Sequence, residues 1–187
     1  MRWLPLLLPL FCACRRETAA VAATVPPPAP ERPSIVLFTL DTMRADHLGC
    51  YGSAAAKTPR LDALAQESVR FTAAHATCPI TLPSHASLLT DLYPFRHGVR
   101  ENTSFALPAA AETVAEKLAA AGYETAGFVA SVVLARSSGI AQGFATFEEP
   151  RRGSRPDRFF PSIRASEVNA KVRRWWEARD PARPFFL

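Results

Sequence analysis

The sequence predicts an α/β protein with a mainly parallel sheet flanked by helices. Two patterns support this prediction: short, continuous apolar runs, which are typical of strands buried in a parallel sheet, and amphipathic segments that alternate with them along the chain. The composition agrees, because 187 residues with 48% hydrophobic and 21% charged residues suffice for one globular domain with a sizeable core.

Apolar runs at three places are the predicted strands. The first, SIVLFTL at residues 34–40, is rich in large aliphatic side chains, so we expect it to be buried on both faces. YETAGFVAS at residues 123–131 is predicted to be a second buried strand, and PFFL at residues 184–187 the beginning of a further one. Because that last strand stops at the end of the sequence, we expect a truncated chain with an incomplete sheet.

The segments between these runs have the pattern of helices. TPRLDALAQESV at residues 58–69 places a proline in its first turn, and SEVNAKVRRWWEAR at residues 166–179 is amphipathic. Two further helices are predicted at residues 83–90 and 111–121, the second of them ending at Gly122.

The first 16 residues have the pattern of an export signal, with one early arginine, a short leucine-rich core and then small residues. The string Phe11-Cys12-Ala13-Cys14 resembles the lipobox of bacterial lipoproteins, which makes Cys14 a candidate lipid anchor; cleavage without lipid in the run 19–23 is the alternative. Residues 17–33, rich in alanine and proline, are predicted to be an extended linker, and residues 34–187 the folded domain. We therefore expect an exported protein of the periplasm or cell envelope, attached to the membrane if Cys14 is lipidated.

The basic net charge of +5 does not predict a nucleic-acid partner, because the basic residues are dispersed. Their densest cluster, residues 151–158, is interrupted by glycine, serine and proline in the manner of a surface loop, and no aromatic residues interleave with it. Cys50 and Cys78 could pair in an exported protein, but the sequence does not place them within bonding distance. The oligomeric state is not indicated.

Asp41 and Thr42 directly follow the first predicted strand. In open α/β sheets ligands bind beyond the carboxyl ends of the strands, and a carboxylate held there is a hard oxygen donor suited to a divalent metal. The alternative is that Asp41 only caps a turn.

Thr81 precedes Pro83 and an apolar run, which predicts that Thr81 sits at or next to the N-cap of a helix. The free backbone N–H groups and the dipole of such a helix favour an anion, so a sulfate or phosphate group would be held against the Thr81 oxygen. An ordinary helix cap explains the same residues. His85, four residues later, could bind the anion or protonate a leaving group, although a lone histidine on a helix is more often a surface or core residue.

A longer pattern carries a family resemblance. Residues 34–52 (SIVLFTLDTMRADHLGCYG), 58–76 (TPRLDALAQESVRFTAAHA) and 81–99 (TLPSHASLLTDLYPFRHGV) resemble, in that order, the amino-terminal half of the sulfatase family within the alkaline phosphatase superfamily. TVAEKLAAAGYETAGFVAS at residues 113–131 and QGFATFEE at residues 142–149 resemble the helix, strand and loop that follow in it. The resemblance implies an alkaline phosphatase/sulfatase-like fold.

The resemblance also implies roles for single residues. Asp41 stands where the family places its first metal-binding aspartate, and Thr42 replaces the paired second one. Thr81 stands at the nucleophile position, where sulfatases usually have a cysteine or serine that is oxidised to formylglycine, a conversion that threonine cannot undergo. Cys78 does not replace it, because the proline of the signature lies at its proper distance from Thr81 instead. His85 replaces the signature arginine.

Threonine is the nucleophile in other branches of the superfamily that resemble this pattern, among them nucleotide phosphodiesterases and phosphoethanolamine transferases, and a metal can activate its hydroxyl. We therefore expect a metal-dependent hydrolase of sulfate or phosphate esters, on a small molecule or glycan, with Thr81 and His85 as catalytic residues. Asp41 and Thr81 are the expected ligands of a divalent metal (Ca, Mg, Zn or Mn), and we expect the remaining ligands beyond Leu187. The alternatives are a phosphodiesterase or phosphoethanolamine-type transferase, and a non-catalytic exported binding lipoprotein.

Overall fold

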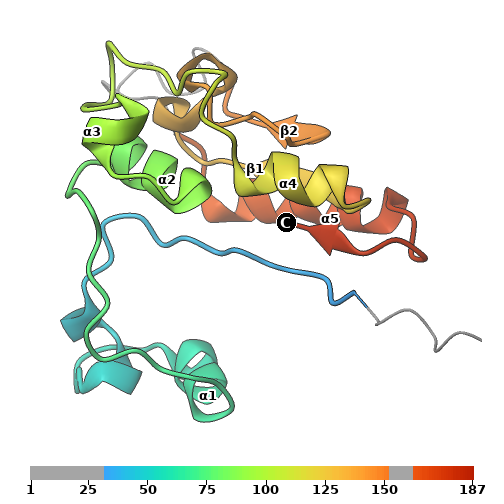
Figure 1. The fold of residues 1–187 in the computed structure, drawn as a ribbon. Helices are drawn as coiled ribbons and strands as arrows, with labels where there is room; N and C mark the ends of the chain where they lie inside the picture. Colours follow the sequence, from blue (N-terminus) through green and yellow to red (C-terminus); the bar gives the residue numbers. More distant parts are fainter. Residues whose placement is uncertain (1–31, 152–161) are drawn as a thin grey trace, which may run out of the picture. The chain divides into compact units, whose positions relative to one another are not determined.

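The computed structural model describes residues 32–151 and 162–187 (Figure 1). The predicted export signal, Cys14, nearly all of the linker and most of the basic cluster at residues 151–158 lie outside the described residues, so these predictions stay untested. None of the helices in the described ranges is both long and apolar enough to cross a bilayer.

A parallel sheet forms the middle of the fold. Strand β1 (Glu124–Phe128) lies at its centre, between β2 (Thr146–Glu148) and β3 (Phe185–Phe186), and both pairs are parallel. The predicted strands at residues 123–131 and 184–187 are therefore confirmed, each as a shorter element. Strand β2 lies inside QGFATFEE, which was expected to be a loop.

Five α-helices are found among the described residues, and four of them match predicted segments. The fifth, α3, was not predicted; it is a single turn that ends at Gly98, whose φ of 82° is the left-handed conformation that favours glycine. The helices are α1 (Pro59–Gln66), α2 (Thr81–Thr90), α3 (Pro94–His97), α4 (Val114–Ala120) and α5 (Ala165–Ala178), and the short 3₁₀ helices are η1 (Ala45–His47), η2 (Gly49–Tyr51), η3 (Val132–Leu134) and η4 (Arg136–Ser138).

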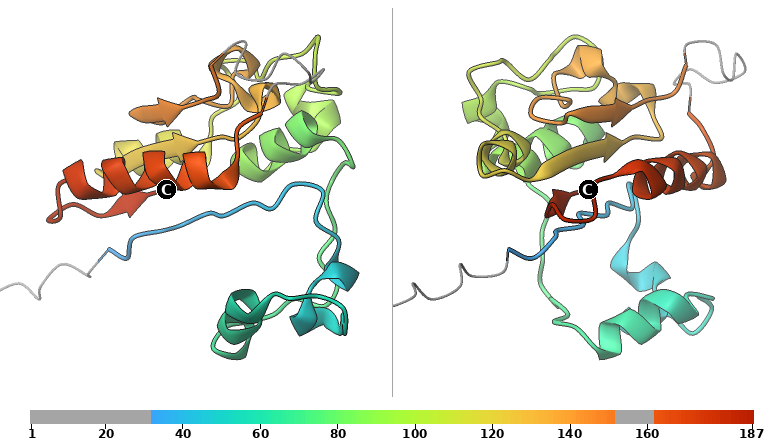
Figure 2. Two further views of the ribbon diagram at one scale, coloured as in Figure 1. Left: turned by 180° about the vertical axis from the view of Figure 1, so that it is seen from behind. Right: turned by 90° about the vertical axis from the view of Figure 1, so that its right-hand side faces the viewer.

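Helices α4 and α5 cover opposite faces of the sheet (Figure 2). The alternation of side chains along β3 explains why. Phe185 packs with Trp175 of α5, whereas the next residue, Phe186, packs with Ala115 of α4. The predicted class, a parallel sheet flanked by helices, is confirmed by these layers.

Helix α2 belongs to the larger core on the α4 side of the sheet. Its residues Leu82, Ala86 and Leu89 are spaced by four and three positions, so they form one buried stripe. The stripe leaves Thr81 and His85, also four residues apart, on a different side of the helix. The stripe packs against Val99, Leu107, Ala111, Val133, Leu134 and Ile140.

The first apolar segment differs from its prediction. Ile35 forms a parallel bridge with Phe186, and the Leu37 N–H donates to the Leu187 carbonyl at 2.7 Å, so the segment adds to the sheet beside β3. However, Val36 is 60% and Phe38 72% exposed, so the expectation that this segment is buried on both faces is wrong for the described structure. The segment lies at the edge of the described sheet, and the described residues leave these two side chains largely exposed there.

Two of the blocks that carry the family resemblance pack together around Asp62, in the first turn of α1. Its carboxylate accepts hydrogen bonds from the Cys50 N–H at 2.7 Å and the Thr58 hydroxyl at 3.1 Å. A Cβ added at Gly49 would fall 2.5 Å from an Asp62 carboxylate oxygen, so any larger residue there would push Asp62 away from these hydrogen bonds. Cys50 and Cys78 are both free thiols.

Candidate active site

Thr81 is the first residue of helix α2. Ile80 is the N-cap and no side chain caps the helix from that position. The N–H of Leu82 instead donates to Asn102 Oδ1 at 2.9 Å, and Pro83 has no N–H to offer. Asn102 therefore occupies one of the backbone N–H groups that were expected to face an anion, and Pro83 lacks another, so fewer N–H groups face this position than the sequence predicted.

Asp41 and Thr81 meet directly. The Thr81 hydroxyl donates to Asp41 Oδ2 at 3.0 Å, across 40 positions of sequence. Asp41 is exposed and follows the edge segment of the sheet, whereas Thr81 is half-buried at the start of α2. The two residues that the sequence singled out from separate segments thus form one pair at the carboxyl end of the edge segment.

His85 lies one turn further along α2 and both of its ring nitrogens have partners. Its Nδ1 is 2.8 Å from the carbonyl oxygen of Thr81, and its Nε2 is 3.2 Å from the hydroxyl of Thr39. Neither ring nitrogen forms a hydrogen bond with the Thr81 hydroxyl, because that hydroxyl donates to Asp41.

Thr42 has a φ of 61°, in the left-handed region that β-branched residues avoid. Such a conformation costs on the order of 1–3 kcal/mol and occurs mostly at functional sites. Aspartate and asparagine tolerate this conformation better than threonine does, so Thr42 places backbone strain directly after Asp41.

Asp41 and Thr81 are the two described residues of this site whose chemistry suits a divalent metal. Asp41 and Thr81 present hard oxygen donors 3.0 Å apart, and oxygen is the donor that Ca²⁺ and Mg²⁺ prefer. Within residues 32–151 and 162–187, no three histidine, cysteine, aspartate or glutamate side chains cluster in a way that could hold a metal. The chemistry of the pair fits a divalent cation, but its two donors fall short of the six or more oxygens that such ions take.

The other histidines do not join this site. His97 is 2% exposed; the Val99 N–H donates to its Nδ1 at 3.1 Å, so its Nε2 carries the proton and donates to Ser87 Oγ, also at 3.1 Å. Burial lowers the pKa of His97. His75 is exposed.

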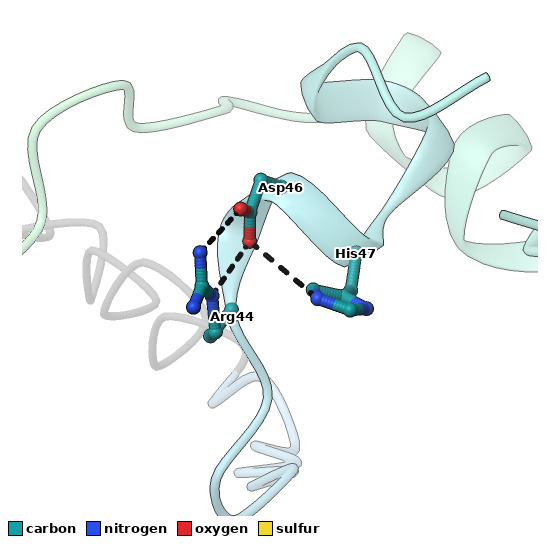
Figure 3. Close-up of polar contacts among 3 residues, drawn as sticks. All are labelled: Arg44, Asp46 and His47. Atoms are coloured by element: carbon teal, nitrogen blue, oxygen red, sulfur yellow. Dashed lines mark hydrogen bonds and ion pairs between the residues drawn. The ribbon is translucent and has the colours of Figure 1, made fainter. Parts of the chain in front are cut away.

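His47 lies beside an exposed ion pair at the start of η1, formed by the N-cap residue Arg44 and Asp46 (Figure 3). Arg44 forms a bidentate contact with Asp46, at 2.9 and 2.6 Å, and the hydrogen bond from Arg44 lowers the pKa of Asp46. His47 Nε2 is 4.0 Å from the same carboxylate. Both partners of the ion pair are exposed, so it contributes little to stability.

The lowered pKa of His97 predicts that the protein becomes less stable as the pH falls below about 6.5, the usual pKa of a histidine in an unfolded chain. In this window the unfolded histidine takes up a proton that the buried one resists, so the free energy of unfolding falls by at most about 1.4 kcal/mol per pH unit. Urea titrations of the wild type and His97→Gln at several pH values measure the slope, which should be flatter in the variant. His75→Gln, at an exposed position, is the control; an equal slope in the wild type and His97→Gln would contradict the prediction.

Two residues of the site, Thr39 and Asn102, were not predicted from the sequence. Thr39 is two positions before Asp41, so the period of an extended segment places both on one face; that signal was available. Asn102 caps α2 from a loop 20 positions away in the sequence, and no local pattern indicates such a contact.

Known proteins match this chain over most of its length. The family model described as Sulfatase matches residues 33–158. Steryl-sulfatase of Mus musculus is 36% identical over 133 residues, which cover 65% of this chain and 21% of the relative. An ulvan-active sulfatase of Formosa agariphila is 43% identical over 97 residues, which cover 52% of this chain and 19% of the relative.

Solved structures share the fold. A structure determined in complex with its substrate D-glucosamine-2-N,6-O-disulfate superimposes with a TM-score of 0.70 at 24% identity, covering 83% of this chain and 33% of that one. At this identity the likeness concerns the fold alone. The chain therefore spans about a fifth of the length of the two curated relatives and a third of the solved chain.

Proposed function

Because this chain belongs to the sulfatase family, we propose that it carries the nucleophile of a metal-dependent hydrolase of sulfate esters, with Thr81 as the attacking residue. The observation that supports this role most directly is the 3.0 Å hydrogen bond from the Thr81 hydroxyl to Asp41. It joins a nucleophile to a carboxylate acceptor at the carboxyl end of a strand segment, where α/β proteins bind their ligands.

The proposed reaction has two steps. The Thr81 oxygen attacks sulfur, its proton passes to Asp41 Oδ2 and the ester S–O bond breaks; the departing alkoxide takes a proton from solvent water, and the Asp41 carboxyl then loses its proton to solvent. Water next attacks the sulfur of the sulfated Thr81 and gives one proton to Asp41, which passes it to the Thr81 oxygen as the bond from that oxygen to sulfur breaks. Hydrogen sulfate leaves and loses its remaining proton to solvent. The hydrogen bond of the free site already runs in the direction of the first proton transfer.

Asp41 and Thr81 would hold the divalent cation (Ca, Mg, Zn or Mn), which when bound would lower the pKa of the Thr81 hydroxyl and balance the charge of the sulfate group. His85 lies beside the nucleophile, bonded to its backbone carbonyl. Unlike the cysteine or serine of most family members, Thr81 would act as an unmodified hydroxyl.

The substrate class follows from the relatives only in broad terms. One is named for steryl sulfate and another for ulvan, so we propose a sulfate ester on a small molecule or a glycan. With an export signal predicted at residues 1–16, we place this substrate outside the cytoplasm, with the protein free or anchored through Cys14.

A phosphate-ester reaction is the second candidate, favoured by Thr81 itself. An unoxidised hydroxyl beside a carboxylate suits attack on phosphorus as well as on sulfur, with an acceptor alcohol or water resolving the covalent ester. The enzyme would then be a phosphodiesterase or a phosphoethanolamine-type transferase.

Comparison of Thr81→Ala with Thr81→Ser tests the proposal. Because the chain spans a fifth of its relatives' length, the assay uses the full reading frame that encodes it, with aryl sulfate and with phosphate mono- and diesters, in the presence of each divalent metal. We expect sulfate-ester turnover that Thr81→Ala lowers by at least about 10³-fold and that Thr81→Ser largely keeps.

The outcomes separate the candidates. Phosphodiester turnover that depends on Thr81 would replace the sulfate proposal by the phosphate one. Turnover that survives Thr81→Ala, or no turnover of any of these esters, would contradict a nucleophilic Thr81, and the latter would favour a non-catalytic binding protein.

A further inference from the structure

Two side-chain hydrogen bonds join the edge segment to helix α2, and the one between Asp41 and Thr81 is the first of them. Thr39 and Asp41 lie two positions apart on one face of the extended segment, and two residues of such a segment span about 6.6 Å. His85 and Thr81 lie four positions apart on one face of α2, where four residues rise about 6 Å. Because the two spacings agree, both pairs close together: Asp41 with Thr81 at 3.0 Å and Thr39 with His85 at 3.2 Å.

The same face of α2 continues with an apolar residue that lines a pocket. Leu88, the next residue on this side of the helix, lines one pocket of about 380 Å³ with Ile35 and Leu37, which precede Thr39 on the same face of the segment. The polar pairs therefore occupy the end of the interface that lies at the active site, and the apolar side chains occupy the other end.

The proton positions on His85 follow from its partners. The Thr81 carbonyl can only accept a hydrogen bond, so Nδ1, 2.8 Å away, carries the proton. In the neutral ring Nε2 then has a lone pair, and the Thr39 hydroxyl must be the donor to it. His97 has the opposite tautomer, because the Val99 N–H donates to its Nδ1.

We propose that Thr39 is a positioning residue of this site: its hydroxyl engages His85 Nε2, so that the imidazole is fixed with Nδ1–H on the Thr81 carbonyl. His85 then braces the first turn of α2 and so fixes the Thr81 hydroxyl towards Asp41. With Nε2 accepting from Thr39, the neutral ring has no free N–H for a leaving group, so His85 is a positioning residue too. The expected effect on turnover rests on the function proposed for Thr81. The hydrogen bond between Thr39 and His85 is independent of that function.

Nitrogen NMR of the 187-residue chain tests the hydrogen bond without any assay of turnover. At pH 8, histidine-labelled protein should show His85 with a proton on Nδ1 and an Nε2 chemical shift that differs from that of an Nε2 lone pair without a hydrogen bond. His85→Phe assigns the signal by removing it. Thr39→Val should move the Nε2 chemical shift to the value of a nitrogen whose lone pair accepts no hydrogen bond. Thr39→Ser, which keeps the hydroxyl, should leave the shift unchanged.

His97 is the internal reference, because its partners do not include Thr39 and its signals should not move. A proton on Nε2 of His85 in the wild type, or an Nε2 resonance unchanged by Thr39→Val, would overturn the proposal. If Thr39→Val does not fold, the wild-type spectrum and Thr39→Ser decide the question.

The effect of the Thr39 hydrogen bond on turnover is tested by combining substitutions at Thr39 and His85 in the protein that the full reading frame encodes. Thr39→Val should lower kcat on the order of tenfold with KM within about twofold, as outer partners of a catalytic group do. In a His85→Phe background the same substitution should change nothing further, because its effect passes through His85. An equal loss in both backgrounds would contradict a role through His85. Absence of turnover in the wild type would instead overturn the proposed function and leave the NMR result standing.

Discussion

Replacement of Asp41 by asparagine is expected to abolish the dependence of turnover on divalent metal and to lower kcat/KM by roughly 10³-fold, which corresponds to about 4 kcal/mol. The amide oxygen can still accept the hydrogen bond from Thr81, so the variant removes the negative charge with little change in shape. The loss would therefore measure what the carboxylate does as a proton acceptor and metal ligand. Both effects are measured by adding each divalent metal to the EDTA-treated protein that the full reading frame encodes and assaying its turnover.

Asp46→Asn is the matched control, since Asp46 is also an exposed aspartate but is paired with Arg44 in η1. It should leave turnover and metal dependence unchanged. Asp41→Asn should also keep the melting temperature of the wild type, because substitutions at exposed positions usually cost less than about 0.5 kcal/mol. Metal-stimulated turnover in Asp41→Asn within tenfold of the wild type would exclude Asp41 as an essential ligand.

Leu82→Ala is expected to destabilise the chain by about 3 kcal/mol, in the range observed for fully buried leucines. Leu82 is 0% exposed and belongs to the buried stripe of α2, directly after the proposed nucleophile. Removal of its side chain leaves a cavity that the packed residues around it cannot close. For a chain of this length the loss corresponds to a fall in melting temperature of roughly 6–12 °C, which circular dichroism of the 187-residue chain measures.

Leu88→Ala makes the same substitution in the same helix at a residue that is 51% exposed. It should cost less than about 1 kcal/mol, so the pair separates the effect of burial from that of helix propensity. Equal losses in the two variants would contradict the assignment of the Leu82 side of α2 to the core.

The helices and strands were predictable wherever their pattern is local. The proline and apolar run of α2, the proline at the start of α1 and the run that becomes β1 each carry their own signal, and all three elements are found. Strand β2, only three residues long, has too little sequence to alternate, so its pairing with β1 decides its conformation. The exposure of Val36 and Phe38 depends on what covers the sheet edge, which hydrophobicity alone does not encode.

The residues of the site also divide into those that the local sequence predicts and those whose role depends on contacts between distant segments. Thr81 and Asp41 were found because each stands at the end of a recognisable element and matches a family position. Their contact, and the one between Thr39 and His85, joins segments more than 39 positions apart. Asn102 was missed because its partner is a backbone N–H, which every residue but proline offers.

The sequence by itself determined the fold class, the order of most elements and the chemical groups of the proposed nucleophile and metal ligand, because periodicity and residue type are local properties. Only the tertiary structure decided that Asn102 occupies the start of α2, that His85 faces Thr39 rather than the Thr81 hydroxyl, and that His97 is a buried core residue. These outcomes depend on which polar groups find partners when distant segments pack, and a buried or half-buried group takes the partner that packing brings within hydrogen-bonding distance.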